Sequence, residues 1–262
     1  MEHLVLGLLL LAGTLAAGNP LHQRDLQVDK ETKMDMAPNS FDDQYSGCNT
    51  SMWNLLGNLN RTEFANNSIY AEAWTLASKE WGKKGLPVPS LTGMKTEHAV
   101  AIMAYTLDTP LYSTFNAAVR EAGKSRQEYR NKFQFKVLHF LLTQALTILR
   151  NAQPFCYDVY RGIRGIHFTA QQNDPVRFGQ FTSSSLNSTV AKRFGQDTFF
   201  MVHTCYGVPV ANFSDFPTEE EVLIPPYEKF QVTNITKSQN KTDIKLISQG
   251  TFSKYNCELL KG

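Results

Sequence analysis

The stretch FQFKVLHFLLTQALTILRNAQPFCYDVYRGI at residues 133–163 separates two kinds of sequence. Residues 133–150 are a long apolar run that predicts a helix, and Pro154 follows it because proline cannot continue a helix interior. Residues 157–161 begin a series of short runs that are typical of strands, separated by Gly, Pro and Asn. We therefore predict a mainly helical first half and a mainly β second half.

The runs on either side of residue 152 support this division. Apolar residues recur at three- and four-residue spacings in 64–81 and 111–122, which predicts two helices, whereas 100–106 fits a helix or a strand. One short helix at 188–194 interrupts the predicted strands, which are 157–161, 178–184, 198–206, 222–224, 230–235 and 244–251. Helices followed by strands predict an α+β fold and disfavour a Rossmann sheet, and no G-x-G-x-x-G run is present.

Length and composition limit the class of protein. The 262 residues suit one domain with trimmed termini, and 42% hydrophobic with 19% charged residues is the balance of a globular chain. Lys and Arg number 26 against 24 Asp and Glu, which leaves a formal charge of +2. This charge is too small and too evenly spread to bind a phosphate backbone, so we expect no nucleic acid partner.

The N-terminus predicts export. The apolar run 4–17 ends in small residues and is shorter than the roughly 20 residues of a membrane span, so residues 1–18 are predicted to be a cleaved signal peptide. Residues 19–36 are polar and aperiodic, which predicts a flexible or removable leader. Residues 37–262 then form the folded domain.

Two further features agree with an extracellular location. Asn-x-Ser/Thr triplets, which are glycan acceptors only in secreted chains, begin at Asn49, Asn60, Asn66, Asn187, Asn212, Asn234 and Asn240. The four cysteines, Cys48, Cys156, Cys205 and Cys257, contain no C-x-x-C pair and predict two disulfides. Three pairings are open, of which Cys48–Cys257 with Cys156–Cys205 leaves the two bridges unentangled.

The first candidate for chemistry is the acidic run Glu219, Glu220 and Glu221 before the apolar residues 222–224. Alternation along a strand places Glu219 and Glu221 on one face and Glu220 on the other. Two like charges on one face repel, which makes the pair notable. A solvated loop-to-strand corner is the alternative interpretation.

Arg161 and the serine run 183–185 are the other candidates. A guanidinium at the end of a strand suits a phosphate, and the glycine after it would let a ligand approach the backbone. A surface arginine or a structural ion pair is the alternative for Arg161, and Arg164 competes for the role. The serines could position a ribose or phosphate, or cap the next helix.

Histidine and serine offer no second kind of site. His139 lies in the apolar helix and His203 in a strand, and neither has a partner histidine at ligand spacing, so we expect no metal. A Ser-His-Asp hydrolase is disfavoured because G-x-S-x-G is absent.

In chain order, Arg161, the serine run 183–185 and Glu219-x-Glu221 form an R…S-x-S…E-x-E series. This series resembles that of the arginine-specific mono-ADP-ribosyltransferases, vertebrate ecto-enzymes. The resemblance covers nearly the whole mature chain, through Cys48, Cys257 and the segments 40–45, 101–106, 159–162, 178–181 and 221–226. It implies a helical lobe on a β-sandwich core that binds NAD, and the disulfides Cys48–Cys257 and Cys156–Cys205.

The resemblance also implies roles for single residues. Arg161 would hold the NAD phosphates, Ser183 would brace the site of the nicotinamide ribose, Glu221 would be the catalytic carboxylate and Glu219 would bind the acceptor guanidinium. Further NAD contacts would come from Tyr105, Gly162, Gln180 and Ser214.

The implied reaction is transfer of ADP-ribose from NAD, a substrate, to arginine side chains, with release of nicotinamide and without a metal. An NAD glycohydrolase, and a secreted binding module without turnover, are the alternatives. Family members are often glycolipid-anchored, but this chain stops five residues after Cys257 without an apolar tail, so a soluble secreted form is expected.

Overall fold

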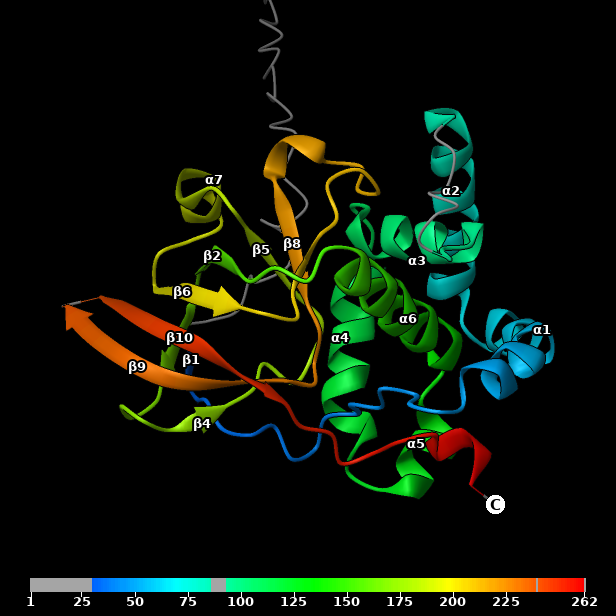
Figure 1. Ribbon diagram of the computed structural model, residues 1–262, viewed down its shortest axis with the longest axis horizontal. Coiled ribbons are helices and arrows are strands. Elements are labelled where there is room, and N and C mark those ends of the chain that lie inside the picture. The colour runs from blue at the N-terminus through cyan, green and yellow to red at the C-terminus, as the bar shows by residue number, and fades with distance from the viewer. Residues whose placement is uncertain (1–29, 86–92, 239, 262) are drawn as a thin grey trace, which may run out of the picture.

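The computed structural model describes residues 30–85, 93–238 and 240–261 (Figure 1). Apart from the short helix at Ser188–Arg193, helices gather on one side of the molecule and strands on the other, as the division near residue 152 predicted. The helices are α1 Asn49–Asn66, α2 Ser68–Lys84, α3 Thr96–Thr106, α4 Leu111–Ala122, α5 Arg126–Lys132, α6 Lys136–Ala152 and α7 Ser188–Arg193, with short 3-10 turns η3 Pro217–Glu219 and η4 Glu258–Leu260.

Two sheets contain the strands. A parallel pair joins β1 to β3, and an eight-stranded sheet has the order β4-β9-β10-β6-β2-β5-β8-β7. The strands are β1 Lys30–Lys33, β2 Tyr157–Ile163, β3 Ile166–Thr169, β4 Pro175–Val176, β5 Thr182–Ser185, β6 Thr198–Thr204, β7 Val208–Pro209, β8 Glu221–Ile224, β9 Glu228–Ser238 and β10 Lys241–Thr251. The predicted α+β class is confirmed.

The large sheet folds over at the junction of β2 and β5. These strands share one paired position, Tyr160 opposite Ser185, whereas β2 and β6 are paired along their whole length. Side chains from both halves, such as Val159 and Phe200 on one and Val222 and Ile224 on the other, are fully buried in one apolar cluster. The two halves thus enclose a common core, as in the expected β-sandwich.

Several predicted boundaries move. The helix expected over 64–81 is two helices, because Asn67 ends α1 and its side chain accepts a hydrogen bond from Tyr70 N to cap α2. The central helix begins at Lys136, where the Glu63 carboxylate accepts the N–H groups of Lys136 and Val137 at 2.7 and 3.0 Å. Burial raises the pKa of Glu63 to about 7.

The N-terminal segment also differs from its prediction. The signal peptide 1–18 and residues 19–29 of the leader lie outside the described residues. Residues 30–33, assigned to that leader, instead form β1 in parallel register with β3, and Met34 N continues the pairing to Thr169 O at 2.8 Å. Hydrogen bonds between the backbones of β1 and β3 order this polar segment. The pattern of side chains in the sequence does not reveal such bonds.

Both expected disulfides are confirmed. Cys48–Cys257 joins the start of α1 to the C-terminal segment, and Cys156–Cys205 joins the residue before β2 to the residue after β6. Within the described ranges, no helix is long and apolar enough to cross a membrane.

Two adjacent aspartates fix the C-terminal segment beside residues 40–48. Asp42 accepts hydrogen bonds from Lys254 N and Tyr255 N, and its Oδ2 lies 2.6 Å from Nη1 of the buried Arg177. Asp43 accepts the N–H groups of Tyr45, Cys257 and Glu258, and burial raises its pKa. We call Asp42, Asp43 and residues 253–258 the tail clamp.

Candidate active site

Arg161 lies at the junction of the two sheet halves. Its side chain, on β2, is only 8% exposed, and Nη1 donates a hydrogen bond to Ser183 O on β5 at 2.8 Å. A guanidinium held from a backbone carbonyl is oriented before any ligand arrives. The structure therefore brings the predicted Arg161 and Ser183 together.

The acidic run is a turn that leads into a strand. Glu219 ends η3, which Pro217 begins in a position that suits its fixed φ, and Glu220 adopts the left-handed conformation at φ 49° before Glu221 opens β8. The predicted strand alternation is therefore wrong, because the strand does not extend back to Glu219. Its conclusion still holds: Glu219 and Glu221 are buried and line the same small cavity, whereas Glu220 is exposed.

The corner between β5 and α7 holds this acidic turn, residues 219–221. Ser185 Oγ donates to Glu219 O at 2.7 Å, and Leu186 N donates to Glu220 O at 3.1 Å. Asn187 Nδ2 donates to Glu220 Oε1 at 3.4 Å. Ser185 belongs to the predicted serine run, whereas Asn187, two residues later, was predicted only as a glycan acceptor.

Two cavities meet at Arg161. The small one is lined by Arg161, Ser183, Glu219 and Glu221 among others. The second is a cleft of about 930 Å³, whose wall also contains Arg161, together with α4, the segment after β1 and parts of β5. A molecule that spans both cavities must pass Arg161, and the larger one has the volume of an ordinary small-ligand site.

The cleft contains polar groups that the sequence reasoning missed. Tyr112, Asn116 and Arg120 are four residues apart on α4 and line the cleft together. Arg120 Nη1 donates to Oε1 of Gln180, a residue that the resemblance singled out. The i, i+4 spacing of polar side chains along a predicted helix was the signal that could have found this face.

Ser183 differs from its two neighbours. The Ser184 hydroxyl donates to Val222 O at 2.7 Å, and that of Ser185 is used by the acidic turn. The buried Ser183 Oγ has no hydrogen-bond partner among the described residues. A buried hydroxyl beside an empty volume is suited to a bound polar ligand, because an unsatisfied polar group is otherwise costly.

Gly162 has a structural reason that the sequence did not indicate. A Cβ at this position would lie 2.3 Å from both Ala191 O and Gly195 O. The end of α7 occupies the Cβ side of this glycine, whereas Gly162 itself lines the small cavity, so the expected approach of a ligand to its backbone stays a prediction. The glycine lets α7 pack directly on β2 beside Arg161.

Tyr105 and Ser214 lie behind the site and line neither cavity. Tyr105 is fully buried, and its hydroxyl donates to Phe181 O at 2.8 Å and accepts from Asn116 Nδ2 at 3.0 Å. Ser214 is also fully buried, and its Oγ accepts from Phe216 N at 3.0 Å in the connection that leads to η3. Tyr105 thus contacts the residue before β5, and Ser214 contacts the residue before η3.

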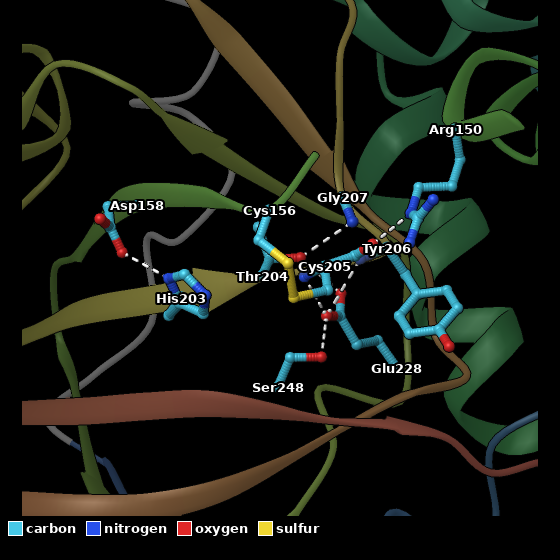
Figure 2. The surroundings of a disulfide bond; sticks show 10 residues. All are labelled: Arg150, Cys156, Asp158, His203, Thr204, Cys205, Tyr206, Gly207, Glu228 and Ser248. Atoms are coloured by element: carbon cyan, nitrogen blue, oxygen red, sulfur yellow. Dashed lines mark hydrogen bonds and ion pairs between the residues drawn. A yellow bond between two sulfur atoms is a disulfide. The ribbon is translucent and has the colours of Figure 1, made fainter. Parts of the chain in front are cut away.

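The histidines have structural partners. His139 is fully buried between Tyr45 OH and Phe41 O, at 2.8 and 3.1 Å, and burial lowers its pKa to about 3. Figure 2 shows His203 beside the Cys156–Cys205 disulfide, with Nδ1 2.8 Å from Asp158 Oδ1. Although these two sulfurs and His203 cluster as metal ligands would, sulfurs in a disulfide are not thiolates.

A buried carboxylate braces the same end of the sheet. Glu228 accepts hydrogen bonds from Thr204 Oγ1, Cys205 N, Tyr206 N and Ser248 Oγ at 2.5 to 3.2 Å (Figure 2). Burial raises its pKa. Glu228 lines neither cavity, so its role is to hold the turn after β6.

Comparison with known proteins identifies the family. The sequence profile of NAD:arginine ADP-ribosyltransferase matches residues 34–254. NAD(P)(+)--arginine ADP-ribosyltransferase 2 of Gallus gallus is 52% identical over 265 residues, which cover 100% of this chain and 85% of the relative. GPI-linked NAD(P)(+)--arginine ADP-ribosyltransferase 1 of Homo sapiens is 45% identical over 276 residues, which cover 100% and 84%.

Solved structures agree. The crystal structure of the eucaryotic mono-ADP-ribosyltransferase ART2.2 matches with a TM-score of 0.74 at 38% identity, over 86% of this chain and 98% of that one. A mutant of ART2.2 in complex with NAD matches with the same TM-score at 36% identity and the same coverage. This chain belongs to the NAD:arginine ADP-ribosyltransferase family.

Proposed function

We propose that this protein is an extracellular enzyme that transfers ADP-ribose from NAD to arginine side chains of proteins and releases nicotinamide. The observation that carries the proposal is the position of Arg161. It forms a wall of the large cleft and also of the small cavity that contains Glu219 and Glu221. A dinucleotide that spans both cavities would place its central phosphates near this guanidinium.

The proposed chemistry begins with the bond between nicotinamide and ribose. This bond breaks with its electron pair on nicotinamide, which leaves as a neutral base, and positive charge develops on the ribose. The buried Glu221 carboxylate would stabilise that charge in a site that excludes most water. Ser183, with its buried hydroxyl, would brace the same ribose.

The second half of the reaction would use Glu219. A guanidinium is protonated at neutral pH and is a poor nucleophile. Glu219 would bind the acceptor guanidinium and accept one proton as a guanidine nitrogen bonds to the ribose carbon. The short turn that separates Glu219 from Glu221 keeps both carboxylates on one cavity.

The other predicted contacts take indirect or partial roles in this proposal. Gln180 and Arg120 would face the adenosine half in the cleft. Gly162 would contribute backbone atoms only, because α7 covers its Cβ position. Tyr105 and Ser214 would act as positioning residues through the backbone they hold.

An extracellular location has three supports. The apolar run 4–17 has the pattern of a signal peptide, and both disulfides require an oxidising compartment to form and persist. The curated relatives include proteins named GPI-linked and Ecto-ADP-ribosyltransferase. Release into the medium, as opposed to attachment at the cell surface, is part of the proposal and is tested by assaying medium and washed cells separately.

One assay distinguishes this function from the alternatives. Purified protein is incubated with NAD labelled in the adenine moiety, with and without agmatine as acceptor. Transfer predicts labelled ADP-ribosyl-agmatine that increases with agmatine. An NAD glycohydrolase would give free ADP-ribose alone, and a binding module would release no nicotinamide; either result would contradict the proposal.

A further inference from the structure

We propose that Asn187 is an N-glycosylation site whose glycan stands at the acceptor side of the active site and selects small guanidines over protein arginines. The selection rests on the proposed transferase function, whereas occupancy of Asn187 does not. Asn187, Ser188 and Thr189 form one of the seven Asn-x-Ser/Thr triplets of the sequence.

The side chain of Asn187 is half-buried at the corner between β5 and α7. Its Oδ1 accepts a hydrogen bond from Thr189 N at 2.9 Å, and its Nδ2 donates to Glu220 Oε1 at 3.4 Å. Glycan attachment replaces one of the two Nδ2 hydrogens and leaves the carbonyl oxygen unchanged. Both hydrogen bonds are therefore compatible with a glycan at this position.

The modification is a group transfer from a lipid-diphosphate-linked oligosaccharide in the secretory pathway. Nδ2 of Asn187 bonds to C1 of the first sugar and loses one proton. The bond between C1 and the diphosphate oxygen breaks, and its electron pair leaves with the lipid diphosphate.

The position of Asn187 Nδ2 determines which substrate a glycan would obstruct. Glu220, the partner of Asn187 Nδ2, stands between Glu219 and Glu221, the two carboxylates that line the small cavity. The walls of the large cleft include neither Asn187 nor Glu220. The attachment atom therefore lies beside the turn that carries both carboxylates and outside the walls of the nucleotide cleft. In this proposal a glycan there obstructs a bulky acceptor but not the dinucleotide.

Four of the other triplets lie far from this corner. Asn49, Asn60 and Asn66 are on α1, and Asn234 is on β9, which Figure 1 places at opposite sides of the molecule from each other and away from the turn before β8. The Asn234 triplet ends in Thr236, and both residues are exposed. It supplies a matched control for a glycan without access to the site.

The experiment uses the full chain expressed in a secretory mammalian cell line. Glycosidase treatment in heavy-oxygen water followed by peptide mapping reports the occupancy of each asparagine. Three variants are compared with the wild type: Thr189→Ala, which removes the triplet but keeps the Asn187 side chain; Thr189→Ser, which keeps the triplet; and Thr236→Ala, which removes the control triplet.

We expect glycan on Asn187 in the wild type and in Thr189→Ser, and none in Thr189→Ala. Transfer to agmatine should be equal in all four proteins. Transfer to a folded protein acceptor should rise about fivefold in Thr189→Ala, the factor that corresponds to ~1 kcal/mol, and should not change in Thr236→Ala.

An unmodified Asn187 in the secreted wild type would overturn the proposal, and so would an occupied Asn187 with equal protein-to-agmatine ratios in wild type and Thr189→Ala. Absence of transfer to agmatine in every protein would instead count against the transferase function. The peptide map would still report occupancy in that case, so the two failures are distinguishable.

Discussion

Among the described residues, two pairs of buried acidic side chains are close in sequence, one in the tail clamp and one in the acidic turn. Asp42 and Asp43 are fully buried, and backbone N–H groups and Arg177 occupy their carboxylates. Glu219 and Glu221 are almost as buried but line a cavity beside Arg161. Burial of acids alone therefore does not identify an active site. An adjoining cavity distinguishes the proposed catalytic pair from the structural one.

The largest expected effect is on stability, in the tail clamp. Asp42→Asn removes the counter-ion of Arg177, whose side chain is 1% exposed, and leaves its charge buried. Loss of one partner of a buried ion pair typically costs about 3–5 kcal/mol of the free energy of unfolding. Urea unfolding monitored by fluorescence measures this loss.

Asp243→Asn is the control for that substitution, because Asp243 is an exposed strand residue and should change stability by less than about 0.5 kcal/mol. If Asp42→Asn lowers the free energy of unfolding by less than about 1 kcal/mol, Asp42 does not stabilise the fold through the tail clamp.

A smaller effect on the free energy of unfolding depends on pH. It arises at His139, which contacts the backbone oxygen of Phe41, the residue before Asp42 of the tail clamp. Its pKa is about 3 in the folded chain against 6.5 for an ordinary histidine, so the unfolded chain binds a proton that the folded chain excludes. The resulting stability is present above pH 6.5 and is lost as the pH falls towards 3. By pH 5 the loss is about 2 kcal/mol.

His139→Gln removes this titration. Its free energy of unfolding should therefore fall less between pH 7 and pH 5 than that of the wild type, whatever the substitution costs at pH 7. Urea titrations at both pH values test the difference. Parallel pH profiles of the two proteins would show that His139 is not the group responsible.

The smallest effect is expected within the acidic turn itself. Glu220 is exposed and outside both cavities, and glutamine keeps the acceptor oxygen that receives Asn187 Nδ2. Glu220→Gln should leave the rate of transfer to agmatine within about twofold of the wild type, as for most surface changes. If Glu220→Gln lowered the rate of transfer as much as the same change at Glu219 or Glu221, lining the small cavity would not distinguish the carboxylates that act in transfer from those that do not.

The sequence singled out the acidic run 219–221 and Arg161 because each belongs to a short motif in which neighbours along the chain are neighbours in space. The class of fold was also predictable, from the change of pattern after Pro154. The tail clamp was not, because the donors to Asp42 lie 212 and 213 residues later in the chain. The same limit hid β1, whose order comes from backbone pairing with β3.

The packing of α7 against Gly162 was also not predictable, because it too depends on residues distant in the chain. A glycine after an arginine fits a ligand approach as well as a close helix contact, and only the three-dimensional position of α7 reveals the helix contact. The geometry of residues 219–221 was misjudged because a 3-10 turn and a strand can place alternate carboxylates on the same cavity.

The central claim is that Glu221 serves bond cleavage and Glu219 serves the acceptor. The most direct test compares Glu221→Gln with Glu219→Gln by the ratio of ADP-ribosyl-agmatine formed to nicotinamide released. Loss of Glu221 should lower both products by about 10²–10³, the effect of removing one preorganised electrostatic group. Loss of Glu219 should abolish transfer while much of the NAD hydrolysis remains. Equal loss of both products in Glu219→Gln would contradict the division of roles.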